Sequence, residues 1–180
     1  MKVKEMVIAA LLTAISIIIP TLFRFLQVVI GPFSATLASH TPVVLAMFIS
    51  PAAAVIVALG SGLGFLLTGL PIVVAMRAFS HVVFALAGAM MFRKGWNFFL
   101  VIGVTTVLHA VVEGLIVFVM LTAGLGNAGD LSAISMTWIT VLGTVGHYIV
   151  DVCIAMPIYK ALKETRIVTM CPLAFRGLKA

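Results

Sequence analysis

The chain has 180 residues, of which 63% are hydrophobic and only 9% are charged, and its formal net charge is +6. Soluble domains carry about 25% charged residues, so this composition excludes a soluble globular protein and indicates an integral membrane protein. The length allows several spans of about 20 residues without a separate soluble domain, so residues 1–180 are predicted to form a single membrane domain.

Six transmembrane helices are predicted, which makes the fold class all-α. Glycine, proline and charged turns separate the apolar segments. The predicted spans are 5–24, 36–50, 52–69, 71–92, 97–122 and 133–161. The second and third spans are the least regular, because no charged residue lies between Arg24 and Arg77. A re-entrant or distorted segment is the alternative there.

Basic residues gather on one side of this six-helix arrangement. They precede the first helix, join the fourth to the fifth and follow the sixth: Lys2, Lys4, Arg93, Lys94, Lys160, Lys163, Arg166, Arg176 and Lys179. The positive-inside rule places this side, with both chain termini, in the cytoplasm, and Arg24 is the exception at the opposite end. The positive charge is thus a topology signal and needs no nucleic-acid partner.

Polar residues inside the predicted helices form three pairs with i,i+4 spacing. The pairs are Arg77 with His81, His109 with Glu113, and His147 with Asp151. Each pair shares one helix face. An ionisable group costs about 2.5–3.5 kcal/mol at a bilayer centre, so these groups should face the bundle interior, pair, or line a wet cavity. With His40, they form the predicted substrate-binding site.

Structural roles are the alternatives for the same residues. Each i,i+4 pair could satisfy itself, and Arg77 could pair with Glu113 or Asp151. His40 alone would suit a helix cap or an interfacial position. Against a purely structural role, the guanidinium of Arg77 is permanently charged and suits recognition of a carboxylate or phosphate.

Small residues recur one turn apart in two predicted helices. The first has Ala10-x-x-x-Ala14, and the third has Ala54-x-x-x-Ala58 followed by Gly60, Gly62 and Gly64. Such residues allow close helix approach, either inside a bundle or against a partner. For the third helix, internal packing or a bend is expected.

Other functional classes find little support in the sequence. The two cysteines, Cys153 and Cys171, have neither metal-ligand nor CxxC spacing, so no metal and no disulfide framework are predicted. There is no G-x-x-x-x-G-K-[ST] motif for ATP and no nucleophile constellation, so no enzyme and no cofactor are predicted.

The chain resembles the substrate-binding S component of an energy-coupling factor (ECF) vitamin transporter. The resemblance rests on its length, six predicted helices, basic first residues, the alanine motif of helix 1, and the stretch from Leu37 to Pro51 before the glycine-bearing helix. It implies a bacterial plasma-membrane protein that works with a transmembrane coupling subunit and two cytoplasmic ATPases. It also implies that Ala10 and Ala14 dock on the coupling subunit and that residues 25–36 cover the vitamin site.

The polar cluster favours a small water-soluble vitamin that bears a carboxylate, because Arg77 and His81 suit charge-assisted hydrogen bonds. Pantothenate and niacin are the leading candidates, and pyridoxine or a hydroxymethylpyrimidine follows if the acidic residues dominate. Two rival functions remain. A stand-alone proton-coupled secondary transporter would use the His/acid pairs as a proton relay, and a structural subunit would use them only between helices.

Overall fold

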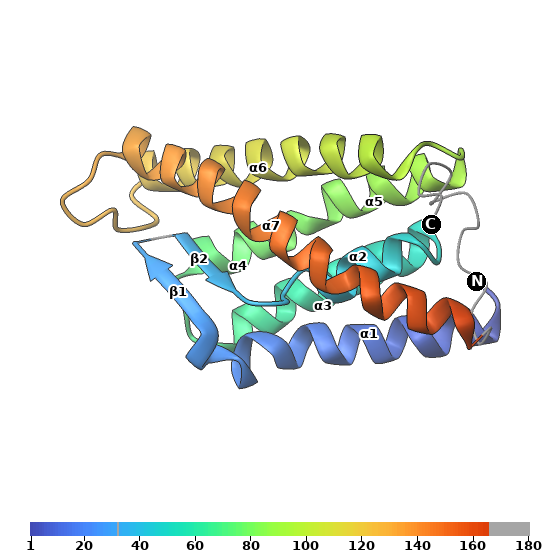
Figure 1. Ribbon diagram of the computed structural model, residues 1–180. Coiled ribbons are helices and arrows are strands. Elements are labelled where there is room, and N and C mark those ends of the chain that lie inside the picture. Colours follow the sequence, from blue (N-terminus) through green and yellow to red (C-terminus); the bar gives the residue numbers. More distant parts are fainter. Residues whose placement is uncertain (32, 166–180) are drawn as a thin grey trace.

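Four apolar segments form helices long enough to cross a membrane in the computed structural model, which describes residues 1–31 and 33–165. They are α1 (Val3–Leu22), the consecutive α4 (Ile72–Phe79) and α5 (His81–Arg93), α6 (Phe98–Thr122) and α7 (Ala133–Glu164). These helices run along a common direction (Figure 1). The chain is a multi-pass membrane protein. Arg166, Cys171, Arg176 and Lys179 of the sequence analysis lie outside the described residues.

The described ends of α1 and α7 lie at the same end of the bundle, as does the turn from α5 to α6 (Figure 1). This end carries Lys2, Arg93, Lys94 and Lys163. Arg24 follows α1 at the other end, in the short 3₁₀ helix η1 (Arg24–Leu26). The arrangement agrees with the asymmetry of charge that the sequence showed.

The predicted second span is wrong as a single helix, and the all-α assignment needs a correction. Residues 36–50 instead contain the end of a β-hairpin and the seven-residue helix α2 (Thr41–Met47). The hairpin pairs β1 (Gln27–Ile30) with β2 (Phe33–Thr36) in antiparallel register, with Gly31 at a φ of +57°. Periodicity alone does not distinguish a short apolar strand from a helix, which explains the error.

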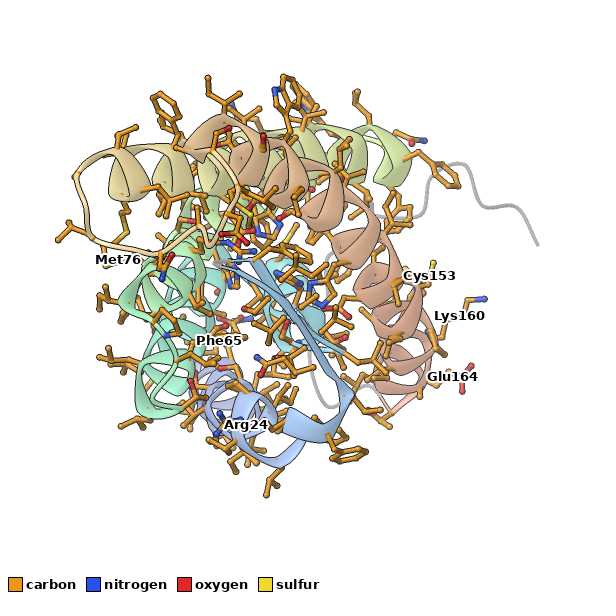
Figure 2. All side chains as sticks on the ribbon, turned by 90° about the vertical axis from the view of Figure 1, so that its left-hand side faces the viewer. Arg24, Phe65, Met76, Cys153, Lys160 and Glu164 are labelled. Carbon is orange, nitrogen blue, oxygen red and sulfur yellow. The ribbon has the colours of Figure 1, made fainter. Side chains whose placement is uncertain are left out.

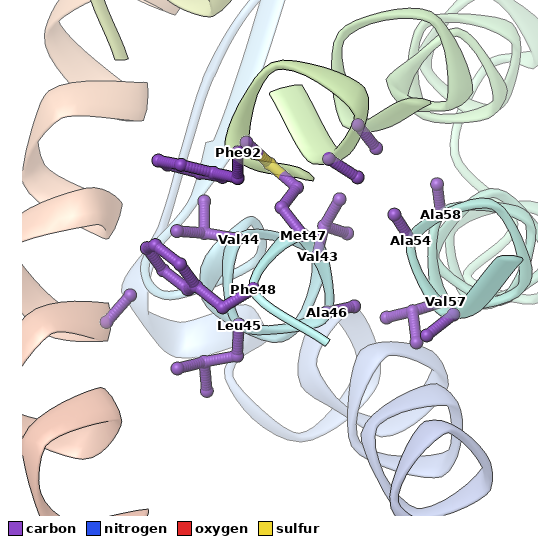
Figure 3. Packing of buried hydrophobic residues seen from close by; sticks show 14 of the residues in the cluster. Val43, Val44, Leu45, Ala46, Met47, Phe48, Ala54, Val57, Ala58 and Phe92 are labelled. Atoms are coloured by element: carbon purple, nitrogen blue, oxygen red, sulfur yellow. The ribbon is translucent and has the colours of Figure 1, made fainter. Parts of the chain in front are cut away.

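Helix α2 is buried on every side. All seven of its residues are buried, and so is Phe48 after it. Its side chains contact α3 (Pro51–Leu67) on one side and Phe92 on another (Figure 3). A helix that is apolar all round is stable only inside a protein or a bilayer. This short helix therefore fills the centre of the bundle and holds the residue before it, His40, at a fixed depth.

Small residues bring α1 and α3 together, which confirms the expectation of internal packing for the third helix. Ala54 and Ala58 are fully buried. A Cβ atom added to Gly60 would lie 2.5 Å from a methyl carbon of Thr13. One added to Gly64 would lie 2.7 Å from Cα of Ile17. The α3 backbone thus approaches the α1 backbone closely enough to exclude a side chain.

Gly64→Ala is expected to destabilise the protein by about 1–3 kcal/mol, because the new methyl group meets backbone that cannot rotate away. Gly103→Ala in α6 is the matched control, since a Cβ there meets nothing within 4 Å. The control should be neutral or slightly stabilising, because alanine favours a helix over glycine by about 0.5–1 kcal/mol. Thermal unfolding in detergent measures both. Equal stability of the two variants would contradict the close α1–α3 contact.

Candidate functional site

The seven side chains that the sequence analysis grouped together meet in one cluster inside the bundle. They come from the residue before α2, the α4–α5 junction, and the middle of α6 and α7: His40, Arg77, His81, His109, Glu113, His147 and Asp151. Six of them are buried, and the His147 side chain is 11% exposed. The cluster lies under the hairpin, whose strands cross the end of the bundle (Figure 2).

A break between α4 and α5 places two of these residues. The fourth predicted span is divided at Ser80, where the hydroxyl donates to the carbonyl oxygen of Arg77 at 2.6 Å. Arg77 ends α4 and His81 begins α5, and their exposures are 4% and 2%. Both side chains therefore point into the bundle from one short stretch.

Glu113 is the acceptor at the centre of one half of the cluster. Its Oε2 accepts from Nη2 of Arg77 at 2.7 Å and from the hydroxyl of Thr144 at 2.5 Å. Its Oε1 lies 3.5 Å from Nε2 of His81 and 3.3 Å from Nε2 of His109. The pairing of Arg77 with Glu113, given above as a structural alternative, is thus present, and it leaves the second carboxylate oxygen facing two imidazoles.

Asp151 organises the other half. Its Oδ1 accepts the backbone N–H of Ala38 at 2.7 Å, and its Oδ2 accepts that of His40 at 2.9 Å. The same Oδ2 lies 2.8 Å from Nδ1 of His40 and 3.2 Å from Nε2 of His147. Ala38 has a φ of +67°, a left-handed conformation that is unfavourable for alanine. The carboxylate therefore holds a strained loop between β2 and α2.

Strand β2 forms the cover of the cluster. The ring of Phe33 lies over the guanidinium of Arg77, 5.3 Å from its central carbon, and fits against Gly143, where an added Cβ would lie 2.4 Å from the ring. The carbonyl oxygen of Thr36 lies 3.0 Å from Nε2 of His147. Cation–π and hydrogen-bond contacts thus join the hairpin to α4 and α7.

A pocket opens between the hairpin and the helices. The space between its walls, including the part open to solvent, is about 250 Å³. It is lined by Ser34, Ser39, His40, Phe65, Val74, Arg77, Ala78, His81, Glu113 and His147. The mixture of a cation, an acid, imidazoles and apolar walls is typical of a site for a small polar ligand.

Several residues of the site were missed by the sequence analysis. Ser34 and Phe33 belong to the hairpin, which was not predicted. Ser61 touches His81, with 3.3 Å between its hydroxyl and Nδ1, but serine is too common in membrane helices to single out. Thr144 was detectable, because it lies seven residues before Asp151 and so on the same face of α7.

Comparisons with known proteins identify one curated relative. The chain is 32% identical over 176 residues to the niacin transporter NiaX of Lactococcus lactis subsp. cremoris (strain MG1363), and the match covers 91% of this chain and 76% of that protein. No family model matches the chain, and no solved structure matches it. Taken with the membrane helices and the buried polar site, this similarity shows that the chain belongs to the family of ECF-type vitamin-transporter S components, in the bacterial cell membrane.

Proposed function

We propose that this chain binds niacin and delivers it through an ECF-type importer. The observation that carries the proposal is the buried Arg77, which lines a ligand-sized pocket beside imidazoles. The relative NiaX, named a niacin transporter, supports the choice of vitamin. Niacin at neutral pH is a flat aromatic ring with one carboxylate, so it needs a cation, a donor for the ring nitrogen and apolar walls.

The pocket offers each of these. Arg77 uses Nη2 on Glu113, and further guanidinium N–H groups are available for charge-assisted bonds to a carboxylate. The hydroxyl of Ser34 is buried and makes no hydrogen bond to the described residues, so it can donate to the same carboxylate. An imidazole N–H can donate to the ring nitrogen, and Phe65 and Val74 supply apolar contacts.

Size favours niacin over pantothenate. A space of about 250 Å³ that is partly open to solvent suits a single planar ring. Pantothenate is a flexible chain with several hydroxyl and amide groups, which would all need partners once buried. The pocket has few polar groups beyond the charged cluster. We therefore rank niacin first.

The proposed binding residues can be tested by the thermal stability of the purified protein. Niacin at about 1,000 times its Kd should add about 4 kcal/mol of stability. Arg77→Lys should weaken niacin binding about ten- to hundredfold, because lysine keeps the charge but loses the planar fork, and a charge-assisted hydrogen bond contributes about 1.5–3 kcal/mol. Arg24→Lys, at the end of α1, is the matched control and should bind normally.

Nicotinamide provides the control for the ligand, because it keeps the ring and lacks the charge. It should bind far more weakly than niacin. Equal affinity for the two compounds would contradict recognition of a carboxylate by Arg77. A response to pantothenate with none to niacin would overturn the choice of vitamin while keeping the binding role.

The proposed partners are an ECF coupling subunit and two cytoplasmic ATPases, with α1 as the docking helix. Ala10 and Ala14 are both exposed on the outer face of α1, one turn apart, while Ala9 and Leu12 face the bundle. Small outward-facing residues permit another helix to approach closely. This supports a docking role for the alanine motif.

A further inference from the structure

All four histidines of the chain meet at one point. The imidazole of His40 is central: its ring centroid lies 4.6 Å from that of His81, 4.7 Å from that of His109 and 4.7 Å from that of His147. Binding one small anion does not require four imidazoles. Imidazole nitrogen is, however, the preferred ligand of several divalent transition metals.

Four residues present their donor atoms as a group. One nitrogen or carboxylate oxygen from each lies within 4.8 Å of all the others, and the residues are His40, His81, His109 and Glu113. We call them the metal quartet. They come from the start of α2, from α5 and from α6, so the fold itself brings them together.

Distances within the metal quartet match metal ligands better than hydrogen bonds. Oε1 of Glu113 lies 3.5 Å from Nε2 of His81 and 3.3 Å from Nε2 of His109. Charge-assisted N–H···O bonds are shorter, at about 2.7–2.9 Å. Ligand atoms around a tetrahedral zinc ion, with bonds of about 2.0–2.1 Å, are about 3.4 Å apart. The two distances therefore fit two edges of such a tetrahedron.

The atoms turned away from this point are held by other side chains, as is usual around a metal. Nδ1 of His40 lies 2.8 Å from Oδ2 of Asp151, and Nδ1 of His81 lies 3.3 Å from the hydroxyl of Ser61. Oε2 of Glu113 is held by Arg77 and Thr144. Three of the four ligands thus have one donor atom fixed and the other left for an ion.

His109 supplies an independent observation. Its side chain is fully buried, yet neither ring nitrogen makes a hydrogen bond to the residues that the structure describes. Buried polar atoms rarely lack a partner, and each exception calls for one, such as an ion. A metal bound to Nε2 would provide it.

Charge balance points the same way. Among the described residues, the buried charged side chains are Arg77, Glu113 and Asp151, one positive and two negative. With neutral imidazoles the cluster carries one net negative charge, which repels a carboxylate ligand. A divalent ion changes this to one net positive charge, because a bound cation dominates the local electrostatics.

We propose that the metal quartet binds a divalent transition metal ion, and that this ion makes the pocket attractive to an anionic vitamin. Three imidazoles and one carboxylate in a compact cluster match zinc best. The first half of the proposal rests on the geometry alone. The second half rests on the proposed function, because it needs niacin or another carboxylate as the ligand.

Calorimetry with zinc chloride alone, on the chelator-treated full-length protein in detergent, tests the first half. One zinc ion per chain is expected. His109→Gln should reduce zinc affinity by at least about tenfold, and Ser61→Ala, which removes only the partner of His81, by about tenfold. His147→Gln should change zinc affinity little, because His147 is outside the metal quartet. Asp130→Asn, in the loop before α7, controls for surface binding.

Several results would overturn the metal site: no saturable zinc binding, equal zinc affinity in wild-type protein and His109→Gln, or a loss confined to His147→Gln. Niacin titrations with and without zinc then test the second half, and removal of zinc should weaken niacin binding at least about tenfold. Equal niacin affinity in both would overturn the electrostatic role. Zinc binding without any niacin binding would keep the metal site and reject the proposed function.

Discussion

Asp151→Ala is expected to destabilise the folded protein by about 3–5 kcal/mol and to release the loop between β2 and α2. The carboxylate is fully buried and accepts the backbone N–H groups of Ala38 and His40. It also faces two imidazoles. Removing one member of such a buried charged network costs about 3–5 kcal/mol, because its partners lose their hydrogen bonds without regaining water. Thermal unfolding in detergent measures the loss.

Hydrogen exchange at the amides of Ala38 and His40 gives the local reading of the same change. Both amides should exchange much faster in Asp151→Ala, since their acceptor is gone. Asp151→Asn keeps one oxygen and should lie between the wild type and the alanine variant. Asp130→Ala is the matched control for loss of an acidic residue, because Asp130 is exposed. Wild-type stability in Asp151→Ala would show that the carboxylate does not hold the loop.

The i,i+4 spacing within the sequence correctly predicted which residues of one helix would act together. His147 and Asp151 share a face of α7 and lie 3.2 Å apart, and His109 and Glu113 do the same on α6 at 3.3 Å. The cost of burying such groups predicted that they would turn inward. Helix periodicity and the energetics of the bilayer were sufficient for this part of the site.

Contacts between helices could not be predicted in the same way. The bonds of Asp151 to Ala38 and His40 join residues more than a hundred positions apart, and no periodicity in the sequence encodes that distance. The convergence of four histidines on His40 depends on α2, a helix of seven residues that was hidden within a predicted long span. The metal quartet was therefore invisible, and the sequence analysis assigned no metal.

The hairpin was missed for a local reason. Its residues, from Gln27 to Thr36, are mostly apolar and continue an apolar chain without a change of composition. Only the glycine at position 31 marks the turn, and a glycine is also a common break between membrane helices. The resemblance placed a cover over the vitamin at residues 25–36, but residues alone gave no sign that the cover is a pair of strands.

Ala14→Phe is expected to abolish niacin uptake in cells that carry an ECF coupling subunit and its ATPases, while niacin binding to the purified variant is unchanged. Ala14 is exposed on the outer face of α1, so a larger side chain there meets lipid and leaves the pocket untouched. A partner helix that approaches at a small residue would meet the new ring directly. The size of the effect depends on contact with a partner and not on stability.

Val107→Phe is the matched control, because Val107 of α6 is also exposed, at 63%, and lies on another helix. It should transport normally. Ala10→Phe should repeat the defect of Ala14→Phe, since the two alanines are one turn apart. Normal uptake by both alanine variants would reject docking through α1. Loss of uptake by Val107→Phe as well would mean that any large side chain on the lipid face impairs transport, and the special role of α1 would then have no support.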